Sequence, residues 1–211
     1  MNCNISPLFP ECAGTAYDPA AVFFSGLLFL SIVLFLSFLI SRYAANRWGG
    51  NRKKTLFAFV GISTLTALAL LCFFGLSAGS IRGIIFCHLL LLCAYSDLQT
   101  RECDDWLSVM ILLAGFIGTE TKMIPARVGA MLFVAAVMLI PSLFSKDGIG
   151  GADIKISAAS AFLLGLRRGL LGLTVGLLAA VVINAVRQKD KKAGFPMIPY
   201  LAVPMMAVYF L

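Results

Sequence analysis

Two short acidic stretches stand out in a chain that contains few carboxylates. One is SDLQTRECDDW, which begins at Ser96 and contains Asp97, and the other is KDGIGGADIK, which ends at Lys155 and contains Asp153. The chain has only 10 acidic residues, and carboxylates beside long apolar runs are costly unless they serve a function. Asp97 and Asp153 are therefore the first candidates for chemistry.

Two carboxylates that are brought together cannot both ionise easily. One holds a proton while the other acts as a base, and a water molecule between them can be activated. Such a pair suffices for hydrolysis of a peptide bond, so we expect no metal ion and no cofactor. Asp153 lies near the start of one expected helix and Asp97 near the end of another. The helix dipoles therefore predict that Asp153 carries the charge and Asp97 the shared proton.

Glycines crowd the approach to the second aspartate. Gly148, Gly150 and Gly151 come shortly before Asp153, and glycine permits positive φ angles and close backbone contact. A peptide substrate must lie extended near the acids, and a glycine loop leaves room for it. The alternative is a flexible turn between two helices, which GIGG alone would favour. An acid just after these glycines, opposite another acid at equal depth, favours the substrate-binding interpretation.

The elements that carry the two acids are expected to be membrane helices. The chain is 60% hydrophobic and only 13% charged, with a mean hydropathy of +0.95, whereas a soluble domain carries roughly a quarter charged residues. Backbone polar groups in lipid must be paired internally, so apolar runs become helices. We predict an all-α bundle of about eight transmembrane spans, with six as the lower limit. The apolar runs lie at 18–42, 54–82, 82–97, 105–120, 127–146, 155–167, 168–187 and after residue 192.

The basic residues predict how the bundle is oriented. Residues 1–20 contain no Lys or Arg, whereas the next polar loop, residues 42–54, contains five. The positive-inside rule then puts residues 1–20 outside and both aspartates at the cytoplasmic face. The net charge of +7 would suggest nucleic acid in a soluble protein. Here it fits loops that face anionic lipid, and we expect no nucleic-acid partner.

Three motifs in the second half of the chain resemble one family. SDLQTRECDDW, then GIGGADIK, and finally FPMIPYLAV at residues 195–203 are similar to the motifs of type IV prepilin peptidases and archaeal preflagellin peptidases. These are GxGD-type membrane aspartic proteases. The bacterial pattern is roughly D-x-x-x-R-x-I-P-N and then G-G-G-D-x-K. The three matches together cover about half the chain, from the third apolar run to the C-terminus. The matching positions are Asp97, Arg101, Gly150, Gly151, Asp153 and Lys155.

The sequence also departs from that pattern. Ala152 stands where GxGD has its second glycine, and Asp105 makes the first motif more similar to the archaeal form. The cytoplasmic insert with paired CxxC motifs, associated with N-methylation in the larger bacterial enzymes, has no counterpart here. The resemblance is therefore to a short form, and we expect peptidase activity without N-methyltransferase activity.

The resemblance implies a substrate and a location. The expected enzyme is an aspartic endopeptidase of the cell membrane that removes the leader of type IV prepilin-like or archaellin-like precursors. Such a substrate has a basic leader followed by a hydrophobic helix, and it is cut at the cytoplasmic membrane face. We expect a single membrane domain over residues 1–211, with an external segment at 1–20 and the peptidase core at 81–211.

Other residues are expected to support the site or to stabilise the fold. Arg101 and Lys155 are expected to pair with nearby acids, and Gly150, Gly151, Ala152 and Asp105 to support the site or bind substrate. His88, without a second His or a close acid, is expected to be a hydrogen-bonded core residue. Whether Cys3 and Cys12 form a disulfide stays open.

Two other classes of function remain as alternatives. In a small proton- or cation-coupled transporter the same two aspartates would relay protons or bind the cation. Against this stand the position of both acids at one face and the lack of paired broken helices. In a non-catalytic assembly subunit, Asp→Asn changes at these positions would leave function intact, which distinguishes that class from a peptidase.

Overall fold

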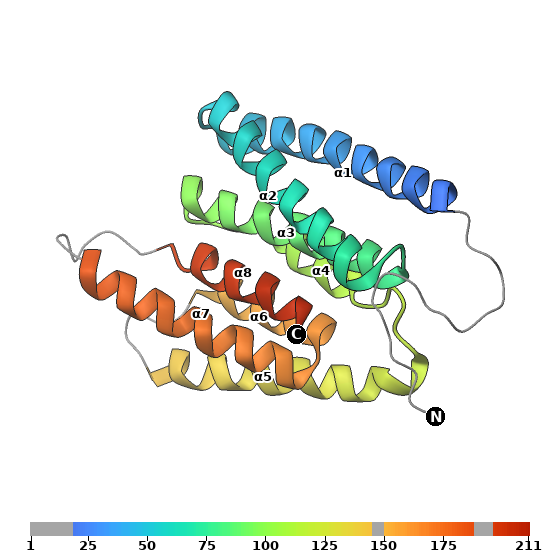
Figure 1. The fold of residues 1–211 in the computed structure, drawn as a ribbon. Helices are drawn as coiled ribbons and strands as arrows, with labels where there is room; N and C mark the ends of the chain where they lie inside the picture. Colours follow the sequence, from blue (N-terminus) through green and yellow to red (C-terminus); the bar gives the residue numbers. More distant parts are fainter. Residues whose placement is uncertain (1–18, 145–149, 188–195) are drawn as a thin grey trace. The chain divides into compact units, whose positions relative to one another are not determined.

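The computed structural model describes residues 19–144, 150–187 and 196–211. Nearly all of the expected external segment 1–20 lies outside these ranges, and so do Cys3, Cys12 and Gly148. The described residues form helices and connecting turns without any strand, so the all-α prediction is confirmed (Figure 1). The helices are α1 (Pro19–Trp48), α2 (Arg52–Phe74), α3 (Ala78–Thr100), α4 (Asp105–Ala114), α5 (Ile124–Phe144), α6 (Gly151–Leu164), α7 (Leu166–Arg187) and α8 (Ile198–Ala207), with 3-10 turns at Thr121–Met123 and Val208–Phe210.

Five of these helices, α1, α2, α3, α5 and α7, are long and apolar enough to cross a membrane. The chain is therefore a multi-pass membrane protein. The helices correspond to the eight expected apolar runs, but three are shorter than a full crossing. Helices α4 and α8 have 10 residues and α6 has 14, whereas a full span needs roughly 20.

Two helix boundaries differ from the expected ones. The third run was expected to be short and to begin at Arg82, but α3 has 23 residues and begins at Ala78. The break comes earlier because Gly75, with φ of 59°, ends α2. Helix α6 begins at Gly151, ahead of the uncharged run that follows Lys155, so Asp153 lies inside its first turn. The sequence left open on which side of Asp153 this helix begins.

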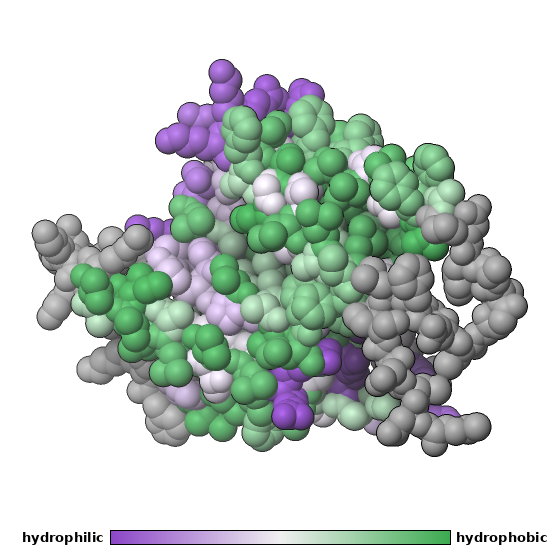
Figure 2. Space-filling view, in the orientation of Figure 1, coloured by the Kyte–Doolittle hydropathy of each residue, from purple (hydrophilic) through white to green (hydrophobic). Residues whose placement is uncertain are grey.

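By their internal contacts the residues form two units, Met1–His88 and Leu89–Leu211. In the first unit α1 packs along α2. Hydrophilic side chains gather where these two helices join, and apolar side chains cover their flanks (Figure 2). Inside the unit, His88 Nδ1 donates to the Ile84 carbonyl at 2.8 Å, and Nε2 lies 2.8 Å from Ser37 Oγ and 3.1 Å from Ser63 Oγ. His88 is thus a hydrogen-bonded core residue, as predicted.

The second unit is built around α6, which packs against α4, α5 and α7. From Ile156 to Leu164 every residue of α6 is buried. The Arg127 guanidinium of α5 donates to the carbonyls of Phe162 and Leu163. These carbonyls belong to the last turn of α6 and have no partner within the helix, so Arg127 holds its C-terminal end. The opposite, N-terminal end of α6 carries Asp153.

Candidate active site

Asp97 lies in the last turn of α3 and is 7% exposed. Its Oδ2 accepts a hydrogen bond of 3.0 Å from the backbone N–H of Ile198, the first residue of α8. A buried carboxylate needs such a donor, because leaving it unpaired would cost several kcal/mol. The site therefore joins α3 to a helix that lies 101 residues further along the chain.

The turn after α3 is strained and firmly tied. Arg101 adopts φ of 58° and is the one residue other than glycine with positive φ in the described ranges. That conformation costs a non-glycine residue roughly 1–2 kcal/mol. Ser96 Oγ donates to the Glu102 carbonyl at 2.6 Å, and Thr100 Oγ1 lies 3.2 Å from the same oxygen. The turn keeps the positive charge of Arg101 close enough to act on Asp97.

Asp153 lies in the first turn of α6 and is partly buried. Gly150 precedes the helix, and its backbone N–H donates to the Asp153 carboxylate. A Cβ atom at position 150 would lie 3.0 Å from Asp153 Oδ2, whereas one at Gly151 would meet nothing within 4 Å. Ala152 is partly buried. Of the neighbouring positions 150 and 151, only Gly150 is in contact with the carboxylate.

Burial raises the pKa of Asp153 from 3.8 to about 6, with a further contribution from the negative charge of Asp97. The hydrogen bond from Gly150 opposes this shift. The start of α6 favours the anion, but that effect is worth only about 1 kcal/mol and burial outweighs it. At pH 7 Asp153 is still mostly ionised, and below pH 6 it mostly holds a proton. Asp97 therefore lies close enough for its negative charge to act on Asp153.

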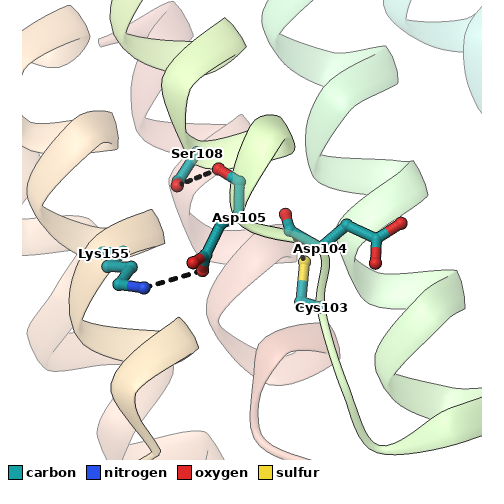
Figure 3. Close-up of polar contacts among 5 residues, drawn as sticks. All are labelled: Cys103, Asp104, Asp105, Ser108 and Lys155. Carbon is teal, nitrogen blue, oxygen red and sulfur yellow. Dashed lines mark hydrogen bonds and ion pairs between the residues drawn. The ribbon is translucent and has the colours of Figure 1, made fainter.

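An ion pair joins α4 to α6. Lys155 Nζ lies 2.7 Å from Asp105 Oδ1, so the expected pairing of Lys155 with an acid is confirmed. Figure 3 shows Asp105 turned toward Lys155, while the Asp104 carboxylate points away from that pair. Asp104 instead accepts a hydrogen bond of 3.3 Å from Trp106 Nε1. Both members of the ion pair are more than half exposed, so this contact holds α4 beside α6 only weakly.

The arrangement combines two carboxylates, one of which acts on the other through its charge, with backbone N–H donors from two different segments. Among the residues that the structure describes, no group of three or more His, Cys, Asp or Glu is placed to hold a metal ion. Sequence reasoning assigned Asp97 and Asp153 but missed Ile198, whose contribution comes from its backbone. A signal was present in Pro199, because proline is favoured in the first turn of a helix and marks the start of α8 beside the site.

Comparison with known proteins finds a family that the segment around the two aspartates resembles. Residues 84–186 match the profile of the type IV leader peptidase family, and this segment contains both Asp97 and Asp153. A prepilin leader peptidase/N-methyltransferase from Xanthomonas campestris pv. campestris is 24% identical over 161 residues, which cover 71% of this chain and 56% of that relative. The chain thus spans little more than half of that relative's length. No solved structure matches the chain significantly. Residues 84–186, just under half of the chain, are thus similar to the type IV leader peptidase family.

Proposed function

We propose that the protein is a membrane-embedded aspartic endopeptidase that cleaves the leader peptide of type IV prepilin-like precursors, with Asp97 and Asp153 as its catalytic residues. The observation that carries this proposal is the pair of coupled carboxylates, at the end of α3 and the start of α6, inside the segment that matches the family. The peptidase core would extend over residues 81–211.

The proposed mechanism uses one proton shared between the two acids. At neutral pH the ionised carboxylate of Asp153 takes a proton from water, and the water oxygen attacks the scissile carbonyl carbon. The protonated carboxyl of Asp97 gives its proton to the carbonyl oxygen. The resulting diol collapses with a proton transferred to the leaving amine. The pair titrates as a unit, so its pKa values belong to both acids together.

Gly150, Gly151 and Ala152 form the edge of the proposed site beside Asp153. Gly150 donates to the carboxylate, and Gly151 is exposed with open space around its Cα. Small residues here leave room for an extended peptide backbone near the acids. Arg101 would act on Asp97 through its charge, and the Lys155–Asp105 pair would hold α6 beside α4.

The basic loops support an orientation with the N-terminus outside and the site facing the cytoplasm of a cell membrane. In this orientation a basic leader stays in the cytoplasm, and the cut falls where the hydrophobic helix of the substrate leaves the bilayer. An archaellin-like precursor has the same chemistry and is a second substrate of this class. The proposed activity is cleavage without N-methylation.

The test is co-expression with a tagged prepilin-like precursor, comparing wild type with Asp97→Asn and Asp153→Asn. Wild type should shorten the precursor, and each variant should fail while inserting in the membrane at the wild-type level. Mass spectrometry of the new N-terminus should show cleavage without an added methyl group. Cleavage by either Asn variant would refute the assignment of the pair. If wild type cuts no precursor, the transporter interpretation of the two aspartates becomes the stronger one.

A further inference from the structure

The first turn of α8 is short of backbone donors. Proline has no N–H, so Pro196 and Pro199 leave Met197 and Ile198 as the donors at the beginning of this helix. The first N–H groups of a helix have no acceptor within it. The N–H of Ile198 finds its acceptor in Asp97 Oδ2 at 3.0 Å, and both residues are buried. This hydrogen bond therefore depends on where α8 lies.

The position of α8 depends on two glycines of α7. A Cβ atom at Gly176 would lie 2.9 Å from Leu201 Cδ2, 3.0 Å from Leu201 Cα and 3.2 Å from the Tyr200 carbonyl oxygen. A Cβ atom at Gly172 would lie 3.1 Å from Val208 Cγ2 and 3.3 Å from Met205 Cα. Several of these neighbours are backbone atoms, which cannot rotate away. Larger residues at these positions would therefore push α8 off α7.

The contacts at Gly176 are the ones nearest the site. Leu201 and Tyr200 lie within three residues of Ile198, whereas the contacts at Gly172 lie in the second half of α8 and beyond. A displacement of the first turn of α8 moves the N–H of Ile198 with it. Hydrogen bonds weaken steeply with distance and angle, so even a small displacement would release Asp97.

We propose that the first turn of α8 positions Asp97 through the backbone N–H of Ile198, and that Gly176, supported by Gly172, is the positioning residue that makes this contact possible. The inference rests on the proposed function, in which Asp97 reacts. Neither glycine touches substrate. They act indirectly: they allow α8 to pack closely on α7, and this packing holds the N–H of Ile198 against Asp97 Oδ2.

Hydrogen exchange at the Ile198 amide tests this contact without any substrate. The amide should exchange slowly in wild type, and Asp97→Leu should speed its exchange by about tenfold or more because the acceptor is gone. Asp97→Asn retains an oxygen acceptor and should preserve most of the protection. Gly176→Ala should speed exchange at Ile198, while Gly129→Ala, where a Cβ atom meets nothing within 4 Å, should not. Amides of α5 report whether each variant is folded.

Cleavage kinetics test the consequence. Gly176→Ala should lower kcat by about tenfold or more with KM within about twofold, because the catalytic geometry changes and substrate contacts do not. Gly172→Ala should have a smaller effect, and Gly129→Ala none. Gly169→Ala provides a clash-matched control, since its Cβ atom would lie 3.0 Å from Ala161 Cα in α6 and away from α8.

The pH profile separates positioning from a merely structural role. An N–H donor favours the ionised form of a carboxyl, so its loss in Gly176→Ala should move the alkaline limb of the profile, where Asp97 loses its proton, to higher pH. Arg101, whose charge acts on Asp97, and Asp153, on which Asp97 acts, are unchanged in this variant. Gly169→Ala should leave the limb in place even if it reduces stability.

The outcomes separate this inference from the proposed function. The inference is overturned, whatever the substrate, if the Ile198 amide exchanges freely in wild type. It is also overturned if neither Asp97→Leu nor Gly176→Ala changes the exchange rate of this amide in folded protein. If the Asn variants of both aspartates abolish cleavage while Gly176→Ala keeps the wild-type kcat and pH profile, the positioning role fails and the proposed function stands. If wild type cleaves no precursor, the proposed function fails and exchange at Ile198 still decides the contact.

Discussion

The surroundings of Asp97 and Asp153 are built in opposite ways. Asp97 is 7% exposed and depends on a donor 101 residues away in α8. Asp153 is only partly buried and takes its donor from Gly150, three residues earlier in the chain. One carboxylate is therefore placed by the packing of distant helices, and the other by a local turn at the start of its own helix.

This difference shows where each half of the site is vulnerable. A local arrangement depends on the residue next to it and little on the rest of the bundle. A long-range arrangement depends on helix packing and on the strained turn that ends α3. Substitutions in the two regions should therefore differ in kind as well as in size.

The largest effect is expected from Gly150→Ala. The new Cβ atom would lie 3.0 Å from Asp153 Oδ2 and would displace the carboxylate. A displacement of this kind lowers kcat by roughly 10- to 100-fold. The φ of Gly150 is −57°, which alanine adopts without strain, so stability should change little.

Gly151→Ala is the matched control for that variant, because a Cβ atom there meets nothing within 4 Å. Its kcat in the precursor cleavage assay should stay within about twofold of wild type, and any loss should appear in KM, because Gly151 borders the proposed substrate site and not the carboxylate. Equal losses in the two variants would contradict the local description of Asp153 and point to a general role of the loop.

The second prediction concerns the dependence of stability on pH. The pKa of Asp153 in the folded protein, about 6, lies above its ordinary value of 3.8, so the folded state binds more protons between these values. This aspartate therefore destabilises the fold progressively as pH rises from about 4 to 6, and fully above 6. Asp153→Asn should raise the free energy of unfolding at pH 7.5 by on the order of 1 kcal/mol, reduced from the full shift by partial exposure.

Denaturant titrations in mixed micelles at pH 4 and pH 7.5 measure this prediction. The gain from Asp153→Asn should be present at pH 7.5 and nearly absent at pH 4. Equal gains at both pH values would mean that the ionisation of Asp153 is not the cause.

The third prediction tests the strained turn beside Asp97. Arg101→Gly relieves a positive φ of 58° and should raise the free energy of unfolding by up to about 1 kcal/mol. The same change removes the positive charge near Asp97 and should lower kcat several-fold, roughly 1 kcal/mol in barrier. Arg101→Lys retains the charge and the strain, so it should keep most of the activity. An Arg101→Gly variant that is fully active would show that neither the charge of Arg101 nor its strained backbone serves catalysis.

The smallest effect is expected at the ion pair between α4 and α6. Lys155 and Asp105 are 54% and 71% exposed, and exposed pairs contribute about 0–1 kcal/mol. Lys155→Ala and Asp105→Ala should each change thermal stability slightly, with cleavage within about twofold of wild type. A double-mutant cycle in low and high salt measures the coupling, and a coupling that salt does not reduce would contradict this description.

Several elements were predictable because their signals are local. Long apolar runs without charge predicted α1, α2, α5 and α7 within a few residues at most boundaries. The start of α3 was missed because the break at Gly75 depends on backbone conformation, while Arg82 lies inside the helix. The sixth run was expected to be short, and α6 has 14 residues. The ends of α4 and α8 were missed, since apolar composition continues past the residues where these helices end.

The sequence by itself determined the membrane class, the helical fold and the two candidate acids. Hydropathy, charge spacing and the GIGGAD motif are properties of neighbouring residues. The contact between Gly150 and Asp153 is local in the same way, because three positions separate them in the chain. The tertiary structure alone decided that the N–H of Ile198 reaches Asp97 and that burial raises the pKa of Asp153. Both depend on which helices pack together, because close approach and exclusion of water arise only when distant segments meet.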